Sequence, residues 1–392
     1  MNHGFKVIIV LILILLSGCA TAPSVKQAPV FYPEPPSPPR IQFLKSYGSS
    51  KDVGAKRSAF AAFVTGERER ITILDKPYGV AGYDGKIYVC DTNATVVVLN
   101  LKKNTFGRMQ GAQGLGKLLQ PINISIDKDG NKYVSDAVRH QVVVFDKNDF
   151  YVKAFGPVEG WKPVDAAVLE GRLYVVDAKK AEIVVFNLQS GEVEKKFGQQ
   201  GEVASQLGLP TNLSIDSEGY LYVSDAARFQ IVKLDRDGNF RGVVGKLGAG
   251  PGSFARPRGT ALDRQNRLYA VDAAFNNVQV FNKDGRLLLF FGKGGKAPGD
   301  LYLGAKVSIN YDDAKYFQQY AEPNFQIEYV LFVTSQFGDH KVNVYGVGTE
   351  TGRTYPTEEE SAKEIEAKKL KFKQEHPETT QDADKAEKSN KP

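Results

Sequence analysis

The sequence is poor in the residue types that most often hold metals or form cross-links. Its 392 residues include 4 His and 2 Cys. Zinc centres take their ligands from His and Cys, and disulfide scaffolds need several cysteine pairs. No set of His, Asp and Glu at metal-site spacing surrounds His140 or His340. We therefore expect no metal and no cofactor, and the composition excludes a disulfide-stapled scaffold.

Sequence motifs of common enzyme classes are also missing. The chain has no Gly-x-Ser-x-Gly nucleophile elbow, so no serine hydrolase of that type is predicted. Two stretches, DKDGN (127–131) and DRDGN (235–239), begin like a calcium loop. The position where such a loop needs Glu holds Val138 in one and Lys246 in the other. We interpret both stretches as hairpin turns.

Long apolar runs are absent outside the N-terminus. There, Lys6 precedes the apolar run Val7–Leu16, which is typical of an export signal and too short to span a membrane. The next residues, Leu-Ser-Gly-Cys, resemble the lipobox of bacterial lipoproteins, in which the cysteine is lipidated after cleavage. The resemblance predicts a signal peptide over residues 1–18 and a lipidated Cys19. Because Ala20 rather than Asp follows, it also predicts anchoring in the outer membrane of a Gram-negative envelope. An ordinary cleaved signal is the alternative.

The segment after the cysteine, residues 19–39, is rich in proline. It contains YPEPPSPPR (32–40), a composition that favours extended polyproline II. We expect a spacer here, with no packed structure.

Five copies of one pattern follow. Each opens with a proline, at positions 77, 121, 163, 210 and 257, so the period is 42 to 47 residues. Each continues with a β-rich strand that ends in Asp, at positions 91, 136, 177, 225 and 272, and then with another apolar strand. A period in this range with four strands per unit is typical of β-propeller blades. The repeated carboxylate predicts an acceptor for backbone N–H groups at a turn.

The fifth copy, PRGTALDRQNRLYAVDAAFNNVQVFNKDGRLLLFFG (257–292), resembles an NHL repeat. The resemblance extends over residues 40–347 and implies an all-β, six-bladed propeller. It says little about function, since propellers of this family serve many roles.

The sixth blade is the divergent one. Its strands are predicted at Lys306–Asn310, Tyr329–Thr334 and Lys341–Val347, with an insertion over 311–327. RIQFLKSYG (40–48) resembles the fourth strand of a blade, yet it precedes the first copy. Since a shared blade removes a free sheet edge, we predict that Ile41–Tyr47 completes blade six.

The C-terminal part, residues 348–392, is strongly charged. Thr357–Glu375 has a capping-box pattern and i,i+4 charge pairs, which predict a helix. Its apolar residues form no continuous stripe, so we expect the helix to be solvated. Residues 376–392 should be disordered.

Candidate site residues follow from the repeat geometry. The second residue after each proline begins the innermost strand, near the mouth of the channel. The polar residues at these positions are Asn123, Asp165, Asn212 and, by extension to blade six, Lys306. The turns on the same face should carry basic and aromatic side chains, which are typical interface anchors. These are Arg139, His140, Lys180, Arg228, Phe229, Arg258 and Phe275.

These observations favour a non-catalytic binding or scaffold module. The expected partners are the membrane, through lipidated Cys19, and an envelope protein or an anionic glycan, whereas an exported lipoprotein is not expected to bind nucleic acid. The alternative is an enzyme, because related six-bladed folds include calcium-dependent lactonases. Asn123, Asp165 and Asn212 offer oxygen ligands for calcium. Against it, the set has one carboxylate, and Lys306 would repel a cation.

Overall fold

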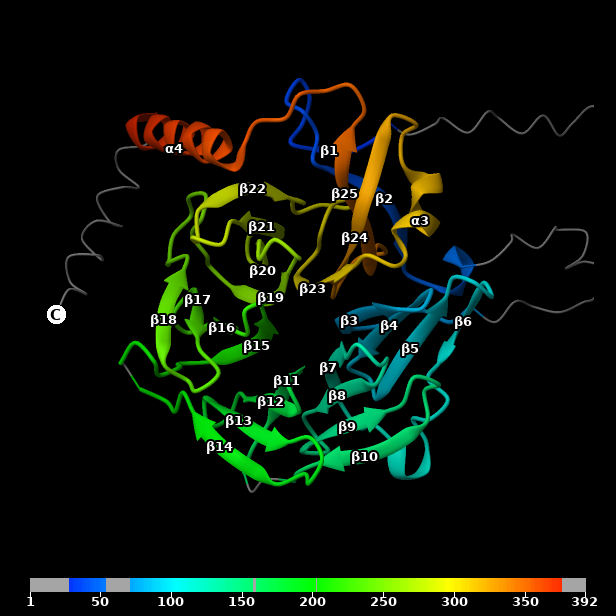
Figure 1. Cartoon of the computed structure of the whole chain (residues 1–392). Helices are drawn as coiled ribbons and strands as arrows, with labels where there is room; N and C mark the ends of the chain where they lie inside the picture. The colour runs from blue at the N-terminus through cyan, green and yellow to red at the C-terminus, as the bar shows by residue number, and fades with distance from the viewer. Residues whose placement is uncertain (1–27, 54–70, 158–159, 202, 376–392) are drawn as a thin grey trace, which may run out of the picture.

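The computed structural model describes residues 28–53, 71–157, 160–201 and 203–375 (Figure 1). These residues form six β-sheets arranged radially around a central axis, which confirms the predicted six-bladed propeller. The predicted export signal and Cys19 lie outside the described residues.

Five of the sheets have four strands each. Blade one consists of β3 (Pro77–Tyr83), β4 (Lys86–Asp91), β5 (Thr95–Asn100) and β6 (Thr105–Arg108). Blade two consists of β7 (Pro121–Ile126), β8 (Lys132–Asp136), β9 (Gln141–Phe145) and β10 (Tyr151–Phe155). Blade three consists of β11 (Pro163–Leu169), β12 (Arg172–Asp177), β13 (Glu182–Asn187) and β14 (Val193–Phe197). Blade four consists of β15 (Pro210–Ile215), β16 (Leu221–Asp225), β17 (Gln230–Leu234) and β18 (Phe240–Val244). Blade five consists of β19 (Pro257–Leu262), β20 (Leu268–Asp272), β21 (Asn277–Phe281) and β22 (Leu287–Phe291).

Blade six joins the two ends of the chain. Its sheet runs in the order β1-β2-β25-β24-β23. The strands are β1 (Phe31–Tyr32), β2 (Ile41–Tyr47), β23 (Gly304–Asn310), β24 (Phe325–Ser335) and β25 (Val342–Glu350). The pairing of β2 with β25, from Ile41 opposite Val347 to Tyr47 opposite Val342, confirms the predicted closure.

The register of the strands defines the two faces of the propeller. In each of the first five blades the opening proline lies opposite the Asp that ends the second strand, as Pro210 does opposite Asp225. The loops that enter the inner strands therefore share one face with the turns between second and third strands. We call this the proline face, and the other the opposite face. Tyr47 of β2 ends at the proline face, whereas Ile41 begins near the opposite one.

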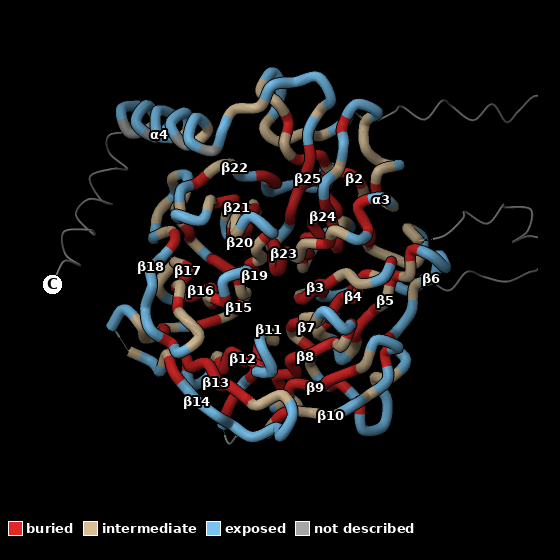
Figure 2. The backbone as a smooth tube through the Cα atoms, viewed as in Figure 1, coloured by how far each residue is buried: buried red, intermediate tan, exposed pale blue. Residues whose placement is uncertain are grey.

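The hydrophobic core lies between the blades. Second and third strands are rich in Val, Ile and aromatic residues on both sides, because each sheet is covered by a neighbouring blade on either side. One core cluster joins Tyr133 and Val142 of blade two to Val175 and Phe186 of blade three. Figure 2 shows this burial concentrated in the inner strands of every blade.

Two expectations about the chain ends need correction in part. Residues 28, 29 and 34–36 of the Pro-rich segment are exposed, but Tyr32 of β1 contacts the rings of Phe291 and Tyr345, with centroids 6.0 and 6.4 Å away. The C-terminal helix α4 (Glu358–Glu375) begins with the predicted capping box, but it lies against β22, where Ile365 packs on the core.

The insertion in blade six forms a short helix, α3 (Ala314–Phe317), and a 3-10 turn, η3 (Gln318–Tyr320). Phe317 is fully buried, and Tyr316 and Tyr320 pack against the same core cluster. The insertion therefore serves packing at the closing blade.

Candidate functional site

The repeated Asp residues organise the loops of the proline face. Asp225 accepts hydrogen bonds from the backbone N–H groups of Gly208 (2.7 Å) and Leu209 (3.0 Å). Asp136 does the same for Leu119 (2.6 Å) and Gln120 (2.9 Å). Asp91 and Asp272 repeat this pattern, as the sequence predicted. Asp177 accepts one such bond, from the N–H of Lys162, and its Oδ2 has no partner among the described residues. These residues hold loops and are not candidates for catalysis.

The predicted channel-mouth residues meet at the axis. Lys306 on β23 reaches across the channel from blade six to blade three, where its Nζ lies 2.7 Å from Oδ2 of Asp165 on β11. The exposed fractions are 7% and 1%, so the ion pair is buried. Glycine makes room for it: a Cβ at Gly259 would lie 2.8 Å from Cδ of Lys306.

Two asparagines complete this channel cluster of Asn123, Asp165, Asn212 and Lys306. Asn212 donates from Nδ2 to Oδ2 of Asp165 (3.3 Å), and Asn123 donates from Nδ2 to the carbonyl of Val164 (2.9 Å). Both amide Oδ1 atoms are buried and have no hydrogen-bond partner among the described residues. The structure therefore brings all four predicted residues together at the axis. Two amide oxygens of this cluster remain without a hydrogen-bond donor among the described residues.

The channel cluster does not fit a calcium ion. Calcium takes six to eight oxygen ligands, usually with several carboxylates. Here Asp165 is the one carboxylate of the cluster, and the ammonium of Lys306 already neutralises it. Within the described ranges, no group of three or more His, Cys, Asp or Glu side chains is placed to hold a metal.

A second polar layer lies beside the channel cluster. The guanidinium of Arg258 lies 5.5 Å from the ring centroid of Tyr78, and its Nη1 donates to Oε1 of Gln336 (2.8 Å). Burial lowers the pKa of Arg258 and raises the pKa of the Tyr78 hydroxyl. Arg258 is 8% exposed. It is therefore buried among residues of its own chain, whereas the sequence placed it on an open binding face.

Two other predicted anchors hold loops of the proline face. Arg139 donates from Nη1 to the carbonyl of Lys117 (2.6 Å). Arg228 donates to the carbonyls of Gly201 and Val203, and its Nε lies 3.8 Å from Asp225. These guanidinium groups are already engaged within the chain, which repeat positions alone do not show.

The remaining predicted face residues lie in separate turns. His140 and Lys180 are exposed, and Nδ1 of His140 lies 2.9 Å from the carbonyl oxygen of Trp161. Phe229 and Phe275 are half-buried, each in the turn of its own blade. The structure therefore places these four on the proline face without joining them into one cluster.

An exposed aromatic pair on the proline face was missed by the sequence reasoning. Tyr302 and Phe337 are 50% and 46% exposed, with ring centroids 5.7 Å apart. They border a cavity of about 260 Å³ that is also lined by Asp300 and His340. The available signal was an aromatic residue in the loop entering blade six and another in the turn of that blade.

Other large apolar side chains are exposed in loops of the same face. They come from the entries to several blades and from one turn: Ile71, Ile73, Leu115, Leu119, Val138, Val203, Leu209 and Leu247. Together with Tyr302 and Phe337 they make what we call the apolar rim. Exposed apolar groups gathered on one face are typical of interaction surfaces.

Solved structures resemble the chain in fold. A Bacteroides thetaiotaomicron protein of unknown function shares 16% identity, covers 78% of this chain and 75% of its own, and gives a TM-score of 0.56. A Xanthomonas campestris gluconolactonase shares 16% identity over 78% of this chain and 98% of its own, with a TM-score of 0.51. A Staphylococcus aureus virginiamycin B lyase shares 13% identity over 72% and 98%, with a TM-score of 0.48. At these identities the likeness shows the propeller fold alone.

No family model matches the chain. The likeness to NHL repeats therefore remains a prediction. In the part of the chain that the structure describes, no helix is long and apolar enough to cross a bilayer.

Proposed function

We propose that this protein is a non-catalytic binding module of the NHL type, tethered to the outer membrane through lipidated Cys19. Its proline face holds an envelope protein. The observation that carries the proposal is the apolar rim, which includes the exposed and contacting pair Tyr302 and Phe337. Aromatic side chains are enriched at the centres of protein interfaces, where they contribute most of the binding energy.

The place where the N-terminal segment joins the propeller supports this arrangement. β1 is the outermost strand of blade six, so the segment reaches the propeller at its outer edge. A tether at the outer edge leaves the loops of the proline face available to a partner.

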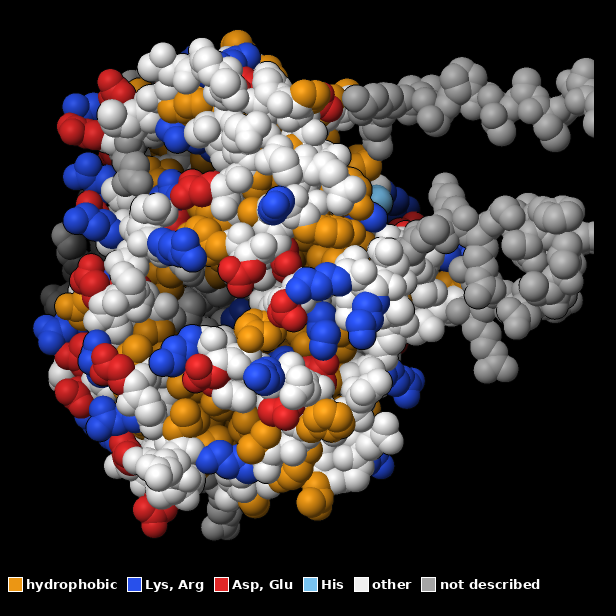
Figure 3. Space-filling model, turned by 45° about the vertical axis from the view of Figure 1, so that its right-hand side comes forward, with side chains coloured by type: hydrophobic (Ala, Val, Ile, Leu, Met, Phe, Trp, Pro, Cys, Tyr) orange, Lys and Arg blue, Asp and Glu red, His pale blue; other side chains and the backbone are white. Residues whose placement is uncertain are grey.

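The charge pattern favours a protein over a uniformly charged polymer as partner. Figure 3 shows one side of the propeller, where basic, acidic and hydrophobic side chains are interspersed around a central hollow. On that side, charge of neither sign forms a continuous field. An anionic glycan is therefore the less favoured ligand.

A crosslinking pull-down from intact membranes tests the proposal. The full chain is compared with the variant Tyr302→Ala/Phe337→Ala and with the control Phe150→Ala, which removes an exposed ring (58%) from the β9–β10 turn on the opposite face. A discrete protein captured by the full chain and the control, and lost in the double variant, supports the proposal. Equal capture by all three forms overturns the assignment of the face.

The calcium-dependent enzyme is the second reading, and the unpaired Oδ1 atoms of Asn123 and Asn212 are the observation in its favour. The Lys306–Asp165 ion pair speaks against it, because an ammonium group lies where a catalytic cation would bind. The response of the folded protein to calcium separates the two readings.

A further inference from the structure

A cavity of about 580 Å³ lies at the outer edge of the propeller, between blades five and six and beneath α4. Its walls are mainly aliphatic, with Leu287 and Leu289 from β22, Ile41 and Val347 from blade six, and Ile365 from α4. The volume falls in the range of small-molecule sites, which are mostly apolar with a few placed polar groups. The cavity is separate from the channel cluster and from the apolar rim.

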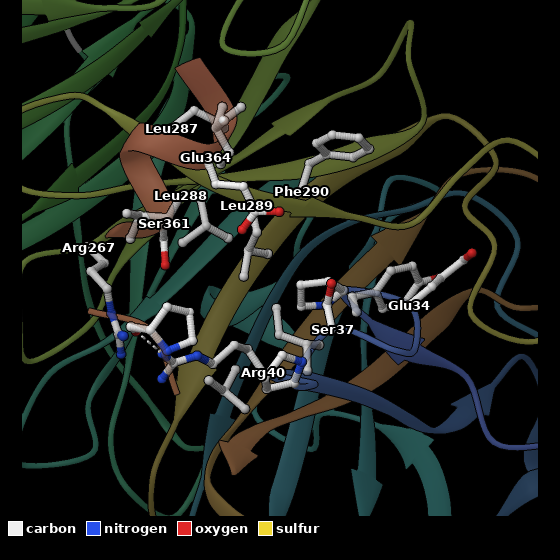
Figure 4. A pocket seen from close by; sticks show the side chains of 18 of the residues that line it. Glu34, Ser37, Arg40, Arg267, Leu287, Leu288, Leu289, Phe290, Ser361 and Glu364 are labelled. Atoms are coloured by element: carbon white, nitrogen blue, oxygen red, sulfur yellow. Dashed lines mark hydrogen bonds between the residues drawn. The ribbon is translucent and has the colours of Figure 1, made fainter. Parts of the chain in front are cut away.

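Basic and acidic side chains both line this edge cavity. Figure 4 shows the side chains of Arg40 and Arg267 converging at one end, with Glu34 at the other and Glu364 beside β22. Lys293, Glu328 and Lys368 also line the cavity. Arg40 is held in place by donating to the carbonyl of Pro356 (2.7 Å) and by stacking 4.4 Å from the ring of Tyr355. Arg267 is fixed by Asp263, whose Oδ2 lies 2.5 Å from its Nε. The arginine end is therefore positioned before any ligand arrives.

The helix that covers the cavity is exposed over much of its described surface. Among its described side chains, Ile365 packs on the blade core, while Leu370 is 61% exposed. Glu359–Lys363 and Glu364–Lys368 are ion pairs within the helix. Such i,i+4 pairs support a helix along its exposed side.

We propose that the edge cavity binds a single alkyl chain with an anionic head group. The chain lies against the aliphatic wall of β22, where each buried methylene contributes about 0.8 kcal/mol. The carboxylate or phosphate lies between Arg40 and Arg267, since guanidinium groups bind such oxygens with paired, charge-assisted hydrogen bonds. A fatty acid and a lysophospholipid both have this chemistry. The inference does not depend on the proposed function.

Photolabelling of the full chain in phosphatidylcholine vesicles tests the site. The probes are a photoactivatable palmitic acid and the matching photoactivatable alcohol, and labelled peptides are mapped by mass spectrometry. We expect the acid to label peptides from β22 and α4. The alcohol should label them roughly tenfold less, as should the acid in Arg40→Gln, because a charge-assisted hydrogen bond contributes on that order. Competition by unlabelled palmitate or lysophosphatidylglycerol tells which source binds better.

Leu289→Trp, which fills the cavity, should abolish labelling. Val243→Trp makes the same kind of change on β18 of blade four, away from the cavity, and should leave labelling intact. Labelling spread over the surface, or equal labelling of the two tryptophan variants, overturns the proposal. Equal labelling by acid and alcohol overturns the role of the arginines.

Discussion

Lys306 and Asp165 form a salt bridge across the central channel, from blade six to the blade directly opposite. Neighbouring blades already share apolar cores, but this pair links blades that have no core in common. Burying two charges costs several kcal/mol per ion before their attraction is counted. The presence of the pair is therefore weak evidence for a net gain in stability.

Removing one partner of this pair should be costly. In Lys306→Met the carboxylate of Asp165 stays buried without its counter-ion, and we expect a loss of roughly 3–5 kcal/mol. Lys306→Met/Asp165→Asn, which removes both charges, should lose clearly less. Urea unfolding of the two variants checks this, and equal losses would contradict it.

The channel should not respond to calcium. Neither millimolar calcium nor EDTA should shift the Tm of the natural protein, because the ammonium of Lys306 occupies the site beside Asp165. Lys306→Glu places a second carboxylate near the free Oδ1 atoms of Asn123 and Asn212. That variant should be less stable and should gain Tm on calcium addition. Calcium stabilisation of the unmodified chain would instead favour the enzyme reading.

Arg228→Ala should lower stability, because the side chain donates to two carbonyls of the loop that enters blade four. We expect a loss of about 1–2 kcal/mol, or a fall in Tm of roughly 2–4 °C. Lys179→Ala, at an exposed site in the turn of blade three, is the matched control and should leave Tm unchanged. Differential scanning calorimetry measures both. No change in Arg228→Ala would restore this arginine as a candidate partner contact.

Asp313 should make stability depend on pH. Burial, and secondarily the neighbouring Asp312, raises the pKa of this carboxyl from 3.8 to about 6. The folded state therefore binds a proton more tightly than the unfolded state, and stability falls as pH rises from about 3.8 to about 6. Asp313→Asn should unfold at a higher temperature than the natural protein above pH 6. The difference should vanish near pH 3.8, and a pH series of melting curves checks both limits.

The sequence predicted the fold well because the repeat has two markers whose meaning is structural. The proline that opens each inner strand and the Asp that ends each second strand lie opposite one another in five blades. Closure by Ile41–Tyr47 was also predictable, since a fourth-strand pattern stood before the first repeat. Strand positions and blade closure can be predicted in this way because they depend on the local alternation of apolar and polar residues and on the residues at turns.

The site was only partly predictable. The position of a residue in the repeat tells on which face it lies, but it does not tell which partner its side chain contacts. The sequence grouped Asp165 and Lys306 at the channel mouth. It did not predict the hydrogen bond between them, which joins residues 141 positions apart. It also treated Arg139 and Arg228 as open anchors, whereas both donate to loop carbonyls. The pairing of Tyr302 with Phe337 depends on how a loop and a turn of different lengths meet in space.

Closure by an N-terminal strand also imposes an order in time. β2 leaves the ribosome before every strand of the first five blades, yet its partner β25 is synthesised after all of them. Until then its apolar edge has no neighbour, and contacts of such high sequence separation form slowly. A chain that is cut short before Val342 cannot complete the ring at all. Incomplete products of synthesis should therefore remain open and protease-sensitive, so the closing blade acts as a check that the whole chain has been made.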